Sequence, residues 1–106
     1  MSLEISAKDA ATRLTHSHPP LLLDCRRPDE VATARISGAL HVPMDELPRR
    51  LNELPPEREI IVYCHHGARS LRVTHWLREQ GFPRVVSMAG GIEAWSREVD
   101  PSVPLY

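Results

Sequence analysis

The chain has 106 residues, of which 42% are hydrophobic and 25% are charged, and its formal net charge at pH 7 is −1. This length suits a single core, so we expect one domain over residues 1–106. The near-neutral charge argues against nucleic acid or an acidic membrane as the main partner. No stretch approaches the roughly 18 apolar residues that span a bilayer, and no basic region precedes an apolar one at the start. We therefore expect a cytoplasmic, monomeric protein with free thiols.

The pattern of apolar and turn-forming residues predicts strands that alternate with helices. Ser6 and Asp9 resemble a capping box at the start of a helix over residues 6–15. Continuous apolar runs at 21–25 and 60–63 indicate strands buried on both faces. Further helices are expected at 28–34, 44–54, 70–80 and 92–97, and further strands at 39–42 and 84–87. This order predicts a three-layer α/β/α sandwich with a mostly parallel central sheet of about five strands.

One loop is distinctive because it places a thiol between the strand at 60–63 and the helix at 70–80. The loop consists of Cys64, His65, His66, Gly67, Ala68, Arg69 and Ser70. No Asp or Glu occurs between Ile60 and Arg78, although the whole chain is nearly neutral. In open parallel sheets, ligands bind beyond the carboxyl ends of the strands, which is where this loop lies. The pattern predicts a nucleophile in a positively charged cradle.

The residue types in the loop suit a reactive sulfur held beside an anion. Cys64 would react as a thiolate, a form that helix N-termini and nearby cations stabilise. Backbone N–H groups of a bent loop can point inward, and Gly67 permits a conformation that a side chain would oppose. Arg69 offers a planar donor to an oxyanion, and Ser70 can cap the helix or donate to the sulfur. A cysteine after a strand is more often a small core residue, but this combination favours a functional Cys64.

Other candidate residues are assigned supporting roles. His65 and His66 could shape the rim of the site or contact substrate, and no further ligand cluster in the sequence suggests a metal or a cofactor. Cys25, at the end of an apolar strand, is interpreted as structural, with a resolving cysteine as the alternative. Asp24 and Arg26 stand at the same sheet edge as the loop, and we expect them to pair and brace it.

Four segments in the expected order resemble the rhodanese-like family. Leu22 to Glu30 contains an Asp-x-Arg followed by an acidic residue, and Ile36-Ser37-Gly38-Ala39 is similar to the second family signature. The loop from Cys64 to Ser70 is similar to a frequent bacterial single-domain variant, and Met88 to Trp95 matches the closing motif. Two positions depart from the common pattern: Ala34-Arg35-Ile36 replaces Gly-His-Ile, and His65 stands where many relatives have arginine.

The resemblance implies a thiosulfate sulfurtransferase that needs no cofactor. The cysteine, here Cys64, would take a sulfane sulfur from a small anionic donor such as thiosulfate, become a persulfide, and pass the sulfur to cyanide, a small thiol or a protein thiol. Arg69 would bind the oxygens of the donor, and His65 would weaken the hold on a doubly charged one. Little proton transfer is needed, so the absence of an obvious general base is no objection.

Three other functions remain as alternatives. A phosphatase on the same fold also uses Cys and Arg in a cradle, but it has five residues between them, whereas Cys64 and Arg69 enclose four. An arsenate reductase on this fold is a related alternative. A non-catalytic regulatory or interaction module is the third, and retention of Cys64 argues against it. Sulfur transfer is therefore the preferred hypothesis.

Overall fold

The computed structural model describes residues 2–106, and its core element is a sheet of five strands. The strands are β1 (Glu4–Ile5), β2 (Leu21–Asp24), β3 (Leu40–His41), β4 (Ile60–Tyr63) and β5 (Val85–Met88). The α-helices are α1 (Ala7–Leu14), α2 (Pro28–Thr33), α3 (Ala68–Glu79) and α4 (Gly91–Glu98). Two 3₁₀ helices, η1 (Met44–Arg49) and η2 (Leu51–Glu53), lie between β3 and β4.

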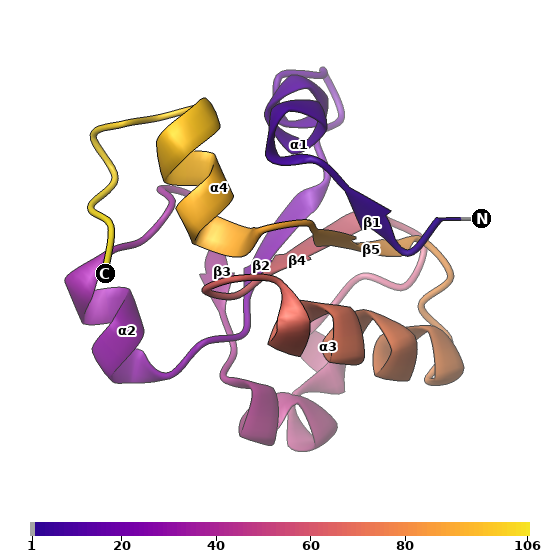
Figure 1. Ribbon diagram of the computed structural model, residues 1–106. Helices are drawn as coiled ribbons and strands as arrows, with labels where there is room; N and C mark the ends of the chain where they lie inside the picture. Colours follow the sequence, from indigo (N-terminus) through magenta and orange to yellow (C-terminus); the bar gives the residue numbers. More distant parts are fainter. Residues whose placement is uncertain (1) are drawn as a thin grey trace.

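All strand pairs in the sheet are parallel, and the order is β1-β5-β4-β2-β3. In the register of the two central neighbours, Leu21 lies opposite Ile60 and Asp24 opposite Tyr63. Figure 1 shows α1 and α4 on one face of the sheet and α3 with the 3₁₀ segment on the other. The predicted α/β/α sandwich is confirmed, and its sheet is parallel throughout.

Each face of the sheet has its own hydrophobic core, because alternate side chains of the buried strands point to opposite sides. Ile61 and Tyr63 belong to the cluster beneath α1 and α4, whereas Ile60, Val62 and Cys64 belong to the cluster beneath α3. All four residues of β4 are fully buried. The strand that carries the loop is therefore fixed on both faces, which gives the loop a rigid start.

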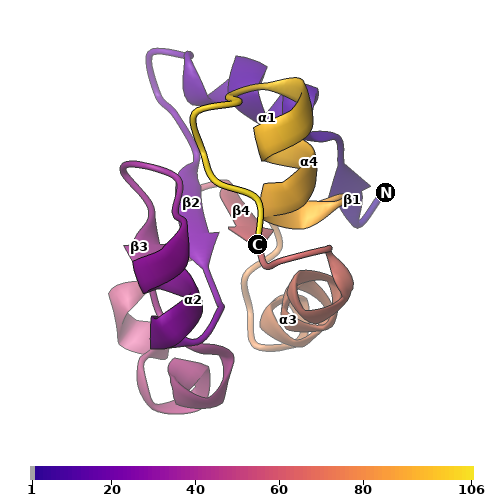
Figure 2. The ribbon, with the colours of Figure 1, turned by 60° about the vertical axis from the view of Figure 1, so that its left-hand side comes forward.

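The carboxyl ends of the strands gather the chemically interesting segments at one edge of the sheet. The loop from Cys64 to Gly67 follows β4, α2 begins soon after β2, and α4 begins soon after β5. The C-terminal segment runs back from α4 and ends close to α2 and to the loop before α3 (Figure 2). The loop after β4, α2 and the end of the chain, which α4 precedes, thus meet at the expected position of the site.

One predicted element is wrong in type, and another was missed. The helix expected at 44–54 is two 3₁₀ helices, because Pro48 lies inside the first and lacks the N–H that an α-helix requires. The missed element is the strand β1, whose two residues are too few to show an alternation of apolar and polar side chains in the sequence. The remaining elements agree within a few residues of their predicted ends. Within residues 2–106, no helix has both the length and the apolar character needed to cross a membrane.

Candidate active site

The thiol of Cys64 lies at the centre of the site, one residue after β4 ends. Its sulfur accepts hydrogen bonds from the backbone N–H of Gly67 at 3.1 Å and of Ser70 at 3.3 Å. The side chain is almost fully buried, with 1% of the residue exposed. Two N–H dipoles directed at one sulfur stabilise negative charge on it. The inward-pointing amides predicted from the sequence are present.

The turn after the thiol depends on Gly67 and Ser70. Gly67 is the N-cap of α3, and its φ of 107° lies in the left-handed region that favours glycine. The Ser70 hydroxyl lies 3.5 Å from the Cys64 sulfur and 2.7 Å from the Ser87 hydroxyl of β5. Ala68 is exposed and begins α3, so it contributes backbone to the turn. These contacts attach the cradle to the neighbouring strand.

The first turn of α4 supports the loop from the other side. The N–H of Ile92 donates to the Cys64 carbonyl at 2.9 Å, and the N–H of Glu93 donates to the His65 carbonyl at 3.3 Å. Gly91 has a φ of 61°, and a Cβ atom at this position would collide with both carbonyl groups. Only glycine therefore allows α4 to approach the loop this closely.

Arg69 is not the free cation that the sequence suggested. Its two terminal nitrogens donate to the two carboxylate oxygens of Glu30 in α2, at 2.7 and 2.9 Å. The hydrogen bond from Arg69 lowers the pKa of Glu30 to about 2, although burial opposes this shift. The loop is free of acidic residues only along the chain, because folding brings Glu30 to it from 39 residues away. The carboxylate of Glu30 therefore largely neutralises the positive charge of Arg69.

Asp24 and Arg26 form the expected pair at the end of β2. Two nitrogens of Arg26 donate to the Asp24 carboxylate at 2.9 and 2.7 Å, and both residues are about 1% exposed or less. The Tyr63 hydroxyl donates to the same carboxylate at 2.8 Å. Arg26 also donates to the carbonyl of Ala34, so the pair fixes the segment after α2. The hydrogen-bond partners of both charged groups offset the cost of removing this pair from water.

Tyr106 connects this buried pair to the loop. Its hydroxyl accepts from Arg26 at 2.8 Å and donates to Glu30 at 2.9 Å. Its ring stacks on His65, with centroids 3.9 Å apart and planes 9° apart. No sequence signal marked this contact, because Tyr106 lies outside every predicted element. Glu30 was visible only as the acidic residue of the first family signature.

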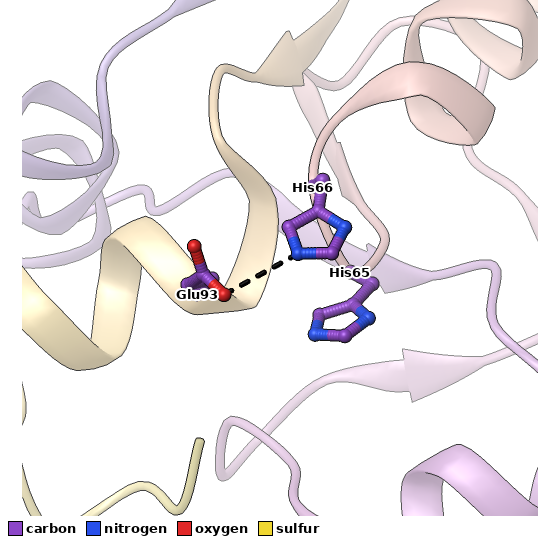
Figure 3. A group of neighbouring side chains, drawn as sticks. All are labelled: His65, His66 and Glu93. Atoms are coloured by element: carbon purple, nitrogen blue, oxygen red, sulfur yellow. Dashed lines mark hydrogen bonds and ion pairs between the residues drawn. The ribbon is translucent and has the colours of Figure 1, made fainter. Parts of the chain in front are cut away.

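His65 stacks on the Tyr106 ring and on the His66 ring, and Figure 3 shows His65 and His66 with Glu93 of α4 beside His66. The His65 ring stacks on His66 with centroids 3.8 Å apart and planes 21° apart, and His66 lies 3.3 Å from the Glu93 carboxylate. The ligand atoms of these three residues lie within 4.8 Å of one another. The lone pair of a ring nitrogen lies in the plane of its ring. The planes of His65 and His66 are nearly parallel, so they intersect at a distance from the rings much greater than a metal–nitrogen bond of about 2 Å. As stacked, the two rings do not converge on one cation.

Cys25 lies one residue after β2, the strand that pairs with β4, and is thus beside Cys64. Its N–H donates to the Tyr63 carbonyl, which continues the ladder by one step, and both thiols are free and buried. Burial raises the pKa of the Cys25 thiol, and the nearby Cys64 and Asp24 raise it further. Cys25 is therefore held in the thiol form in the core beneath α3, which agrees with the structural interpretation.

Comparisons with known proteins identify the family. The rhodanese-like domain family matches residues 6–98. The chain belongs to the rhodanese-like family. A sulfurtransferase of Allochromatium vinosum is 40% identical, with 94% of each chain covered. The thiosulfate sulfurtransferase GlpE of Coxiella burnetii is 35% identical, with 80% of this chain and 79% of the relative covered.

Solved structures of rhodanese-like proteins have the same fold. The crystal structure of a rhodanese-like domain protein from Staphylococcus aureus superimposes with a TM-score of 0.85 at 28% identity, and covers 100% of this chain and 99% of its own. The fold and the family implied by the sequence motifs are thereby confirmed. The cradle around Cys64 lies in the segment from Cys64 to Ser70, which is one of the four segments that resemble the family.

Proposed function

We propose that this rhodanese-like protein is a sulfurtransferase in which Cys64 carries the sulfur as a persulfide. Relatives that match nearly the whole chain are named sulfurtransferases, which supports sulfur transfer in general. The observation that carries the proposal is the pair of backbone N–H groups donating to the Cys64 sulfur. An anionic sulfur on this residue would be stabilised there without any mobile side chain.

The reaction would proceed by double displacement. The Cys64 thiolate attacks the outer sulfur of a donor such as thiosulfate, a new S–S bond forms, and the donor S–S bond breaks. Sulfite leaves with the electron pair, and Cys64 becomes a persulfide. An acceptor nucleophile, such as cyanide, a small thiol or a protein thiol, then attacks the outer sulfur and releases the Cys64 thiolate. The amides of Gly67 and Ser70 face the sulfur in both halves of the cycle.

Mass spectrometry of the intact protein tests the proposal directly. After incubation with thiosulfate, we expect the wild-type protein and Cys25→Ser to gain the mass of one sulfur atom and Cys64→Ser to gain none. Cys25→Ser is the matched control, because it removes a buried thiol from the adjacent strand. The proposal fails if neither thiosulfate nor another sulfane donor adds sulfur to the wild-type protein. Hydrolysis of an aryl phosphate that depends on Cys64 would instead favour the phosphatase.

A further inference from the structure

The charges around the loop bear on which donor the site accepts. The Arg69 guanidinium is bound by both oxygens of Glu30, whose exposed fraction is only 6%. The Arg26 guanidinium is bound by Asp24 in the same way. On the other side, Glu93 lies against His66. The positive charge of Arg69, the arginine of the loop, is therefore balanced by the carboxylate of Glu30.

A balanced site of this kind disfavours a compact dianion. Thiosulfate carries two negative charges within one small group, and its sulfonate end would approach Arg69 and Glu30 together. The attraction of the arginine and the repulsion of the carboxylate then largely cancel, because both groups lie at the same place. The two backbone amides remain to hold the charge that develops on the sulfur. They suit a donor with a single negative charge at the reacting end.

Two adjoining pockets offer room for an organic group beside the loop. The nearer pocket, of about 280 Å³, is lined by Cys25, Arg27, Pro43, Met44, Asp45 and Arg69. The next, of about 330 Å³, shares Met44 and Asp45 and continues between η1 and α3. Its apolar lining consists of Met44, Leu47, Pro48, Val73 and Trp76, and its charged lining consists of Asp45 and Arg72. Together they form a mainly apolar groove of the size that binds small organic ligands.

From these observations we infer that the preferred donor is a small organic sulfane compound with a single charge at its reacting end. Its organic group occupies the groove along Trp76, and Glu30 sets the preference by neutralising Arg69. An organic persulfide fits this description: Cys64 attacks its outer sulfur, the persulfide S–S bond breaks, and the organic thiolate leaves with the electron pair. The inference rests on the proposed sulfurtransferase function and specifies its donor.

Three sulfane donors distinguish the effect of the donor's charge from the effect of its organic group. Thiosulfate carries two charges, methanethiosulfonate is similar in shape but carries one, and benzenethiosulfonate adds an aromatic ring. For the two thiosulfonates, attack by Cys64 on the outer sulfur releases a sulfinate, as thiosulfate releases sulfite. In the wild-type protein, we expect a lower KM for methanethiosulfonate than for thiosulfate, and a lower one still for benzenethiosulfonate. A KM for thiosulfate equal to or below that for methanethiosulfonate overturns the inference, and this comparison requires no variant.

The variant Glu30→Gln tests the role of Glu30. It keeps an acceptor for the Tyr106 hydroxyl but leaves the charge of Arg69 unbalanced. We expect the ratio of kcat/KM for thiosulfate to that for methanethiosulfonate to rise by about tenfold, and the gain to shrink with added salt. The matched control is Glu53→Gln, which removes the same charge from a bidentate pair with Arg50 on the surface. An unchanged ratio in Glu30→Gln, or an equal rise in Glu53→Gln, contradicts the inference.

The groove is tested with Trp76→Ala. We expect this variant to raise the KM for benzenethiosulfonate several-fold and to leave the KM for methanethiosulfonate unchanged. The neighbouring exposed residue provides the control His75→Ala, which does not line the groove. Equal effects on both donors would show that the organic group lies elsewhere. Failure of every donor to add sulfur to Cys64 would instead refute the proposed function, so the two failures are distinguishable.

Discussion

At the scale of single residues, the two thiols differ in environment although both are buried. The Cys64 sulfur accepts two backbone N–H groups, whereas burial and the neighbouring Cys64 and Asp24 raise the pKa of Cys25. We therefore expect iodoacetamide at pH 7 to modify Cys64 first in the native protein, as measured by peptide mass spectrometry over time. Labelling of Cys64→Ser should then be slow, and should become fast only after denaturation. Rapid and equal labelling of both thiols would contradict the difference.

At the scale of elements, the contact between α4 and the loop depends on Gly91. An alanine there meets two costs: a left-handed φ, which costs of order 1–3 kcal/mol, and a collision with the carbonyls of Cys64 and His65. We expect Gly91→Ala to lower Tm by several degrees and to abolish sulfur loading of Cys64. Calorimetry and intact-mass measurements check the two effects.

Gly38→Ala is the control for this prediction. Gly38 also has a left-handed φ, of 87°, but a Cβ atom there would meet no atom within 4 Å. This variant should therefore lose stability from backbone strain alone and keep its sulfur loading. If both variants lost loading equally, the close approach of α4 would not be what shapes the cradle.

At the scale of the whole molecule, Glu30 joins α2, the loop and the C-terminal segment through Arg69 and Tyr106. Its folded pKa of about 2 lies below its ordinary value of 4.5. A carboxyl group with a depressed pKa stabilises the fold above its unfolded pKa and loses that contribution as the pH falls through its folded pKa. The shift corresponds to at most about 3 kcal/mol, which is lost between about pH 4.5 and pH 2.

Urea unfolding at a series of pH values measures this contribution. We expect Glu30→Gln to be less stable than the wild-type protein at pH 7 and the difference in free energy of unfolding to narrow as the pH falls towards 2. The surface variant Glu53→Gln should show a much smaller difference, because its pair with Arg50 is exposed to solvent. A difference for Glu30→Gln that stayed constant with pH would exclude ionised Glu30 as its source.

The sequence predicted the order of elements and the position of the thiol because these depend on local signals. The Ser6 cap, the apolar runs of β2 and β4 and the turn at Gly67 each act over a few residues. Parallel strands place their carboxyl ends at one edge, so the position of the Asp24–Arg26 pair at the edge that carries the Cys64 loop also followed. The 44–54 segment departs from the predicted helix because Pro48 lies within η1 and lacks the N–H that an α-helix requires.

Only the tertiary structure determined how the charges of the site are balanced. Glu30 lies 39 residues before Arg69, and Tyr106 lies 76 residues after Glu30, so neither contact leaves a pattern along the chain. A loop that contains no acid in sequence is paired with one in space, because the folded sheet brings α2 and the C-terminal segment to the same edge. The sequence alone therefore located the Cys64 thiol and the backbone amides that donate to it. The electrostatic field at Cys64 depends on distances between charges, and those distances are set by the packing of the whole fold.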